Sequence, residues 1–138
     1  MPYIVRFVKS VPIANGEQYI NDCCIGGDLV LDRLLPELRE HYSSDLDSIQ
    51  EDWGWFVWFH QGGVKLAIDV HTDDHILGAY QVHLTSSRPR RWFGAKIQDT
   101  PELEQLRGLV VSQLQSWPVE RLQVGRADEK YMPIESPN

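Results

Sequence analysis

Residues 51–75 carry the pattern that decides the fold, EDWGWFVWFHQGGVKLAIDVHTDDH. Gly62-Gly63 divides this stretch into two segments rich in aromatic and β-branched residues, 53–60 and 64–71. Glycine readily adopts the positive φ angles that a two-residue hairpin turn requires. The pattern therefore predicts an antiparallel hairpin that turns at the two glycines.

The hairpin register fixes which side chains share a surface, because successive side chains of a strand point to opposite faces. With the turn at the two glycines, Trp55 faces Val70 and Phe59 faces Leu66. The face that holds these residues is wholly apolar and is expected to contact the helices. The opposite face mixes aromatic and polar side chains, namely Phe56, Trp58, His60, Asp69 and His71.

A third strand is expected over residues 76–84, joined to the hairpin by a loop at 72–74. Ile76 then lies on the apolar face, whereas Gln81 and His83 lie on the other. A loop one residue longer or shorter would place Gln81 and His83 in the core, and the cost of burying polar groups disfavours it.

Two amphipathic helices flank this meander. Asp28 is expected to cap the first helix, whose apolar residues recur on one face, and Pro36 is expected to kink or split it. Thr100 is expected to cap the second helix, with Pro101 at its first position.

Shorter elements complete the chain. Residues 3–8 predict a strand, and residues 19–25 are either its return strand or a loop. Residues 85–91 are expected to form a loop and 92–97 the fourth strand of the meander. Residues 119–124 fit a last edge strand.

This order of elements predicts a single α+β domain over residues 1–125, followed by a polar tail at 126–138. The sheet is expected to be mostly antiparallel, with a four-strand meander plus one or two N-terminal strands. Two helices are expected to pack on one of its faces.

Composition limits the possible partners. The 138 residues include 13 basic and 20 acidic side chains, and the net charge of −7 argues against nucleic-acid binding. Cys23 and Cys24 are adjacent, which does not fit a framework of spaced disulfides. The first ten residues do not resemble a signal peptide, and no apolar run approaches the length of a bilayer span. A cytosolic location without membrane association is expected.

The end of the opening stretch has residue types that bind metals, but their spacing fits no metal motif. It lacks the glutamate of an HExxH helix and the glycine of an EF-hand loop. We interpret the segment as a solvated turn and assign no metal, cofactor or catalytic residue. The metal-capable side chains are Asp69, His71, Asp73, Asp74 and His75.

The mixed face is the predicted docking surface for a protein partner, because aromatic groups among polar ones are typical of interfaces. The alternative is that a loop, a tail or a second copy of the chain covers it. The predicted residues on this face are Phe56, Trp58, His60, Asp69, His71, Gln81 and His83. A second candidate surface, suited to a basic partner, is formed by the acidic residues Asp45, Asp47, Glu51 and Asp52.

Another function also fits the mixed face. A small-molecule-binding protein or a hydrolase could use His60, Asp69, His71 and His83, because a histidine near a carboxylate can act as a general base. A deep pocket that contains at least two of these side chains would favour this alternative, and a flat or covered face would remove it.

The layout of helix, EDWGW segment, aromatic strand, meander and closing helix resembles small uncharacterised bacterial α+β domains. Some of these domains resemble immunity proteins, which neutralise a partner toxin. The resemblance covers residues 28–124, and its sharpest element is EDWGWFVW at 51–58. It implies a non-enzymatic protein with an acidic or aromatic docking face, and it carries over no catalytic residue.

Overall fold

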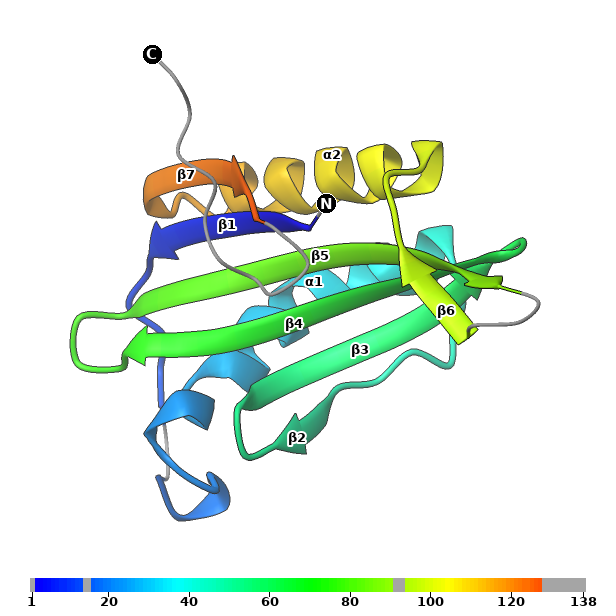
Figure 1. Cartoon of the computed structure of the whole chain (residues 1–138). Helices are drawn as coiled ribbons and strands as arrows, with labels where there is room; N and C mark the ends of the chain where they lie inside the picture. Colours follow the sequence, from blue (N-terminus) through cyan, green and yellow to red (C-terminus); the bar gives the residue numbers. More distant parts are fainter. Residues whose placement is uncertain (1, 14–15, 91–93, 128–138) are drawn as a thin grey trace.

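The computed structural model describes residues 2–13, 16–90 and 94–127, and within these ranges the chain forms one antiparallel sheet (Figure 1). The strand order is β2-β3-β4-β5-β1-β7, and β6 also pairs with β5. The strands are β1 (Tyr3–Val8), β2 (Ile49–Glu51), β3 (Gly54–Gln61), β4 (Val64–Asp74), β5 (Ala79–Arg90), β6 (Gly94–Ile97) and β7 (Glu120–Arg126).

Two helices, α1 (Gly27–His41) and α2 (Pro101–Ser116), pack against this sheet, which confirms the α+β class (Figure 1). Their leucines and valines meet the apolar side chains of β1, β3, β4 and β5 in one continuous core. We call the face that contacts the helices the inner face, and the opposite face the outer face.

The predicted hairpin register is confirmed. Trp55 pairs with Val70 and Phe59 with Leu66 across the turn at Gly62-Gly63. Of the inner-face residues, Phe59 is 5%, Val57 2% and Leu66 0% exposed, and Trp55 is partly buried. The alternation of side chains along β3 and β4 therefore separates the core from the outer face as expected.

The predicted connection between β4 and β5 is wrong. The expected loop at 72–74 belongs to β4, and the chain turns instead at 75–78, where the Asp74 carboxylate accepts hydrogen bonds from the amides of Ile76 and Leu77. Ile76 is thus 84% exposed at the hairpin tip and does not join the core. The observed pairing of β4 with β5 differs from the expected pairing by an even number of residues. Tyr80, Val82 and Leu84 therefore still face the helices, while Gln81 and His83 lie on the outer face.

The end of the meander also differs from the expectation. The residues predicted as a loop at 85–91 continue β5 as far as Arg90, and β6 begins only at Gly94. Residues 91–93 lie outside the described part of the chain. The two strands pair from Ser87 opposite Ile97 to Arg90 opposite Gly94, so the four-strand meander is confirmed.

Helix α1 corrects two expectations. Pro36 does not split it, because the proline ring lies on the exposed side while Leu34, Leu35 and Leu38 hold both halves of the helix against the core. The N-cap is Gly26, with φ of 87°, where a Cβ atom would lie 2.2 Å from the Tyr80 hydroxyl. Asp28 instead lies in the first turn and accepts a hydrogen bond from the Tyr19 hydroxyl.

The remaining elements follow the sequence more closely. Thr100 caps α2 by accepting a hydrogen bond from the Leu103 amide at 3.0 Å, and Pro101 begins the helix. Residues 19–25 form a loop with a short 3-10 turn, so β1 is the one N-terminal strand among the described residues. Strand β7 is an edge strand that pairs with β1 and reaches Arg126, and residues 128–138 of the expected tail lie outside the described ranges.

Candidate binding surfaces

The structure brings six of the predicted site residues to two places on the outer face and its margin. The edge patch, as we define it, comprises Asp45, Asp47, Ile49 and Trp58 beside strand β2. The outer-face hollow comprises Trp53, Asp69, His71 and His83 near the middle of the sheet.

Exposure on the outer face varies from one side of the sheet to the other. Trp58 is 46% exposed on β3, and His60 beside it is also exposed. Toward β5 and β1, His83 is 7%, Thr85 7% and Ile4 2% exposed. The face is therefore open along β3 and covered along β5 and β1.

Trp58 is held by two neighbours on the same face. The ammonium nitrogen of Lys65 lies 4.6 Å from the centre of the indole ring, and the His60 ring meets that indole edge-on at 5.7 Å. Lys65 is the cross-strand partner of His60, so the hairpin register brings all three together. These contacts orient the indole but leave almost half of its surface exposed to solvent.

The acidic segment before β2 lies beside this tryptophan. A surface hollow of about 330 Å³ is lined by Asp45, Leu46, Asp47, Ser48, Ile49, Val57 and Trp58. Ile49 contributes a second apolar side chain, 50% exposed. The two docking surfaces predicted separately from the sequence therefore meet at the edge patch.

Helix α1 anchors the acidic segment. Arg39 donates a hydrogen bond from Nε to the carbonyl oxygen of Leu46 at 2.8 Å, and its guanidinium lies 3.9 Å from the Asp47 carboxylate. The Asp47 side chain is still 82% exposed, so this ion pair does not remove its charge from the surface. The acids of the patch thus remain available to a partner.

Glu51 and Asp52, also predicted as docking residues, do not line this hollow. Their side chains are exposed. The carbonyl oxygen of Glu51 accepts a hydrogen bond from the Cys24 thiol at 2.9 Å, and that of Asp52 accepts one from the side-chain amide of Asn21 at 2.6 Å. Their backbone contacts fasten the loop before α1 to the turn between β2 and β3.

The outer-face hollow has a volume of about 330 Å³ and is built around β4. Asp69 lies directly opposite His83 of β5, and the rings of His71 and His83 are 4.6 Å apart. The Trp53 ring lies 5.2 Å from the His71 ring and 5.7 Å from the Phe56 ring. Phe56 is half-buried in this stack and supports the wall of the hollow.

One hydrogen bond identifies the His71 ring nitrogen that acts as a donor. Its Nδ1 lies 2.8 Å from the carbonyl oxygen of Trp53. A carbonyl oxygen can only accept, so Nδ1 carries the proton and Nε2 of the neutral ring has a lone pair. This contact also fixes the Trp53 backbone against β4.

Burial changes the charge states of the hollow. Desolvation, followed by the influence of His71 and Arg6, lowers the pKa of His83 to about 4, so this ring is neutral at pH 7. Desolvation raises the pKa of Asp69 to about 6, against the opposing effect of Lys65. Asp69 is nevertheless mostly ionised at pH 7, and none of the described residues donates a hydrogen bond to it.

Gln81 links the hollow to the hairpin tip. Its amide nitrogen donates to both carboxylate oxygens of Asp73, at 3.1 and 2.9 Å, which leaves its oxygen facing Nε2 of His83 at 3.1 Å. Gln81 therefore orients its neighbours and does not line the hollow.

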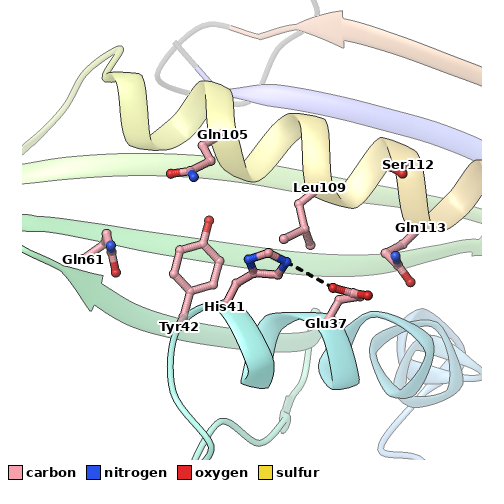
Figure 2. A pocket seen from close by; sticks show the side chains of 8 residues that line it. All are labelled: Glu37, His41, Tyr42, Gln61, Gln105, Leu109, Ser112 and Gln113. Carbon is pink, nitrogen blue, oxygen red and sulfur yellow. Dashed lines mark ion pairs between the residues drawn. The ribbon is translucent and has the colours of Figure 1, made fainter.

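A separate groove of about 390 Å³ lies on the helix side, between α1 and α2 (Figure 2). Figure 2 shows Tyr42, His41 and Glu37 on α1 and its end, facing Gln105 and Leu109 of α2. His41 and Glu37 pair at 3.2 Å, one helical turn apart. Its other lining residues are Gln61, Ser112 and Gln113, so the groove is polar and holds no residue of the predicted site.

Among residues 2–13, 16–90 and 94–127, no group of three or more histidine, cysteine, aspartate or glutamate side chains has an arrangement that could hold a metal ion. Of the described helices, none combines the length and the apolar character needed to cross a bilayer.

Three residues of these surfaces were not predicted from the sequence. Trp53 was placed only at the start of a strand, although its ring forms the wall of the outer-face hollow. Ile49 was not assigned to either surface, although it lies between Asp47 and Glu51, and Lys65 was not linked to Trp58. The register could have revealed Lys65, since it places this residue opposite His60, whereas the return of Trp53 onto β4 depends on a long-range contact.

Comparison of the chain with protein-family models, with curated proteins and with solved structures finds no match.

Proposed function

We propose that this protein is a non-enzymatic binding module that docks a basic protein partner at the edge patch. The observation that carries the proposal is the meeting of two exposed apolar side chains, Trp58 and Ile49, with the carboxylates of Asp45 and Asp47. An aromatic anchor beside charges that steer the partner is the arrangement expected of an interface.

The backbone of β3 supports this proposal. Strand β2 pairs only with Gly54, Trp55 and Phe56. Within the described ranges, no strand pairs with the edge of β3 that faces away from β4 between Val57 and Gln61. An open strand edge can accept an added strand from a partner, with alternate side chains providing specificity.

The partner's expected chemistry follows from these features. Its segment would be extended, with an apolar side chain to lie against Trp58 and with lysine or arginine to face Asp45 and Asp47. An immunity protein that covers a basic toxin would use such a surface, as would a regulatory protein or a second copy of this chain. The two free cysteines fit a reducing compartment such as the cytosol.

The test is retention of a partner by immobilised protein, with extracts of the source cells analysed by quantitative mass spectrometry. Trp58→Ala is expected to weaken binding of the specific partner by about 2 kcal/mol or more. Ile49→Ala should have a smaller effect, and Ile76→Ala is the matched control because Ile76 is exposed at the hairpin tip, outside the patch. Proteins retained equally by wild type and Trp58→Ala would contradict the proposal.

A second candidate function, small-molecule binding, is favoured by one observation. Asp69, His71 and His83 line one surface hollow, so three of the four side chains named for this alternative lie together. Hydrolysis has less support, because none of the described lining residues is a serine, threonine or cysteine that could act as a nucleophile. Binding is therefore the better proposal for this hollow.

A further inference from the structure

We propose that the outer-face hollow binds a small molecule that carries a protonated primary amine, with the Trp53 ring as its wall and the Asp69 carboxylate as its counter-ion. This proposal does not depend on docking at the edge patch, because the two sites share no lining residue.

The first argument is the position of Asp69. The residue lies on β4 in the middle of the sheet, between Phe56 of β3 and His83 of β5. None of the described residues donates a hydrogen bond to its carboxylate. A partly buried carboxylate without a donor is unfavourable, and a ligand that supplies both a positive charge and N–H groups relieves this cost.

The second argument is the hydrogen-bonding character of the lining. His71 uses Nδ1 as a donor to the Trp53 carbonyl, so the lone pair of its neutral ring is on Nε2. Asp69 and His71 therefore both offer acceptors to the hollow. An ammonium group has three donors and no acceptor, so it complements them, whereas an anion would be repelled by Asp69.

The third argument is the aromatic wall. The Trp53 indole is 37% exposed and lies in tilted contact with the rings of Phe56 and His71, at interplanar angles of 32° and 42°. A cation lying near an indole face is stabilised by the ring quadrupole. The hollow of about 330 Å³ also leaves space for a short hydrocarbon chain behind the amine.

The competing cation is already engaged elsewhere. Lys65 is the basic residue whose charge acts on Asp69, but its ammonium nitrogen lies over the Trp58 ring at 4.6 Å. His83 is neutral at pH 7, because desolvation lowers its pKa to about 4. A ligand ammonium would therefore supply a positive charge that these side chains do not place on Asp69.

The test is an NMR titration at pH 7.5 with n-butylammonium, following the Trp53 indole N–H and the His71 ring. We expect saturable shifts with a dissociation constant of about 1 mM, as suits so small a ligand. The neutral analogue 1-butanol should bind about tenfold more weakly, and tetramethylammonium, which has no N–H donor, should also bind more weakly.

Single substitutions test the carboxylate and the aromatic wall of the hollow separately. Asp69→Asn keeps the shape and removes the charge, and should weaken butylammonium binding about tenfold or more. Trp53→Leu should weaken it about threefold to tenfold through loss of the ring. Glu40→Gln, an exposed charge removal on α1, is the matched control and should leave the affinity unchanged. The backbone spectrum of each variant reports whether it is folded.

Three results would overturn the proposal. They are equal affinity for 1-butanol, unchanged affinity in a folded Asp69→Asn variant, and shifts confined to residues outside the hollow. The blocked peptide acetyl-Gly-Lys-Gly-amide, whose one amine is the lysine side chain, separates a free amine from a lysine of another protein. If it binds about ten times more tightly than butylammonium, a protein lysine is the occupant and the small-molecule proposal is wrong.

Discussion

Side chains alternate along strand β4, so that apolar residues lie on one face and charged residues on the other. Leu66, Ile68 and Val70 point to the inner face and are all 0% exposed. Lys65 and Asp69 point to the outer face, where one lies over Trp58 and the other lines a hollow. The same backbone therefore serves stability on one side and the proposed binding sites on the other.

This difference shows how the outer face can tolerate unfavourable groups. A partly buried carboxylate such as Asp69 costs stability, and an exposed indole such as Trp58 contributes little to it. Both persist on strands that the inner face holds against two helices. Mutations on the outer face should consequently change stability less than those on the inner face, and removal of the Asp69 charge should change it in the opposite direction.

The largest effect is expected on the inner face. Leu66→Ala should lower the free energy of unfolding by about 3 kcal/mol, because it removes buried methyl groups and leaves a cavity. Urea denaturation followed by tryptophan fluorescence measures the change. The matched control is Leu77→Ala at the hairpin tip, where the leucine is 67% exposed and the expected loss is below about 0.5 kcal/mol. Similar losses in the two variants would break the distinction between core and surface.

Much of this two-faced design could be predicted from the sequence. Gly62-Gly63 is a local turn signal, and alternation then fixed the partners of Trp55, Phe59 and Val57 along the hairpin. The start of α2 is also set by local contacts, since Thr100 and Pro101 belong to the first turn that they stabilise. Such features depend on neighbours within a few residues, so pattern and propensity suffice.

The features that were not predicted depend on interactions at longer range or on competing local ones. Ile76 was taken as a strand residue, because periodicity cannot reveal that Asp74 caps an exposed turn around it. Pro36 was expected to kink or split α1, but packing against the core keeps Gly27–His41 as one helix despite the lost hydrogen bond. The position of Trp53 beside His71 and the closeness of Asp45 to Trp58 arise only when the chain folds back on itself.

An effect of opposite sign is expected for Asp69→Asn on the outer face. Burial raises the pKa of Asp69 to about 6 from the usual 3.8, so the folded protein holds this proton more tightly than the unfolded chain does. Ionisation therefore destabilises the fold progressively between pH 3.8 and about pH 6, and the penalty is constant above that range. Asp69→Asn should raise the free energy of unfolding by about 1–2 kcal/mol at pH 7.5, with no gain near pH 4.

The measurement is the difference between variant and wild type in urea denaturation at the two pH values. His83 titrates in the opposite sense, since its pKa is lowered to about 4 and it favours the fold as pH rises from 4 toward 6.5. It is present in both proteins, so its own contribution cancels in the difference, whereas the attraction between Lys65 and the Asp69 carboxylate is lost with the charge and is part of the measured difference. A variant that is less stable at pH 7.5, or a difference that does not vary with pH, would contradict the assignment.

The smallest effect on stability is expected at Trp58, the residue with the largest proposed effect on docking. Trp58→Ala removes the contact with Lys65 and the edge-on contact with His60, and both lie on the exposed side of β3. A cation–π contact at such a site contributes about 0.5–1 kcal/mol, so the loss of unfolding free energy should stay near 1 kcal/mol. Thermal and urea unfolding measure it, and Lys65→Met should account for about half of the loss. A loss of about 3 kcal/mol, equal to that of Leu66→Ala, would mean that the indole belongs to the core, and the exposed ring could then not serve as the anchor of an interface.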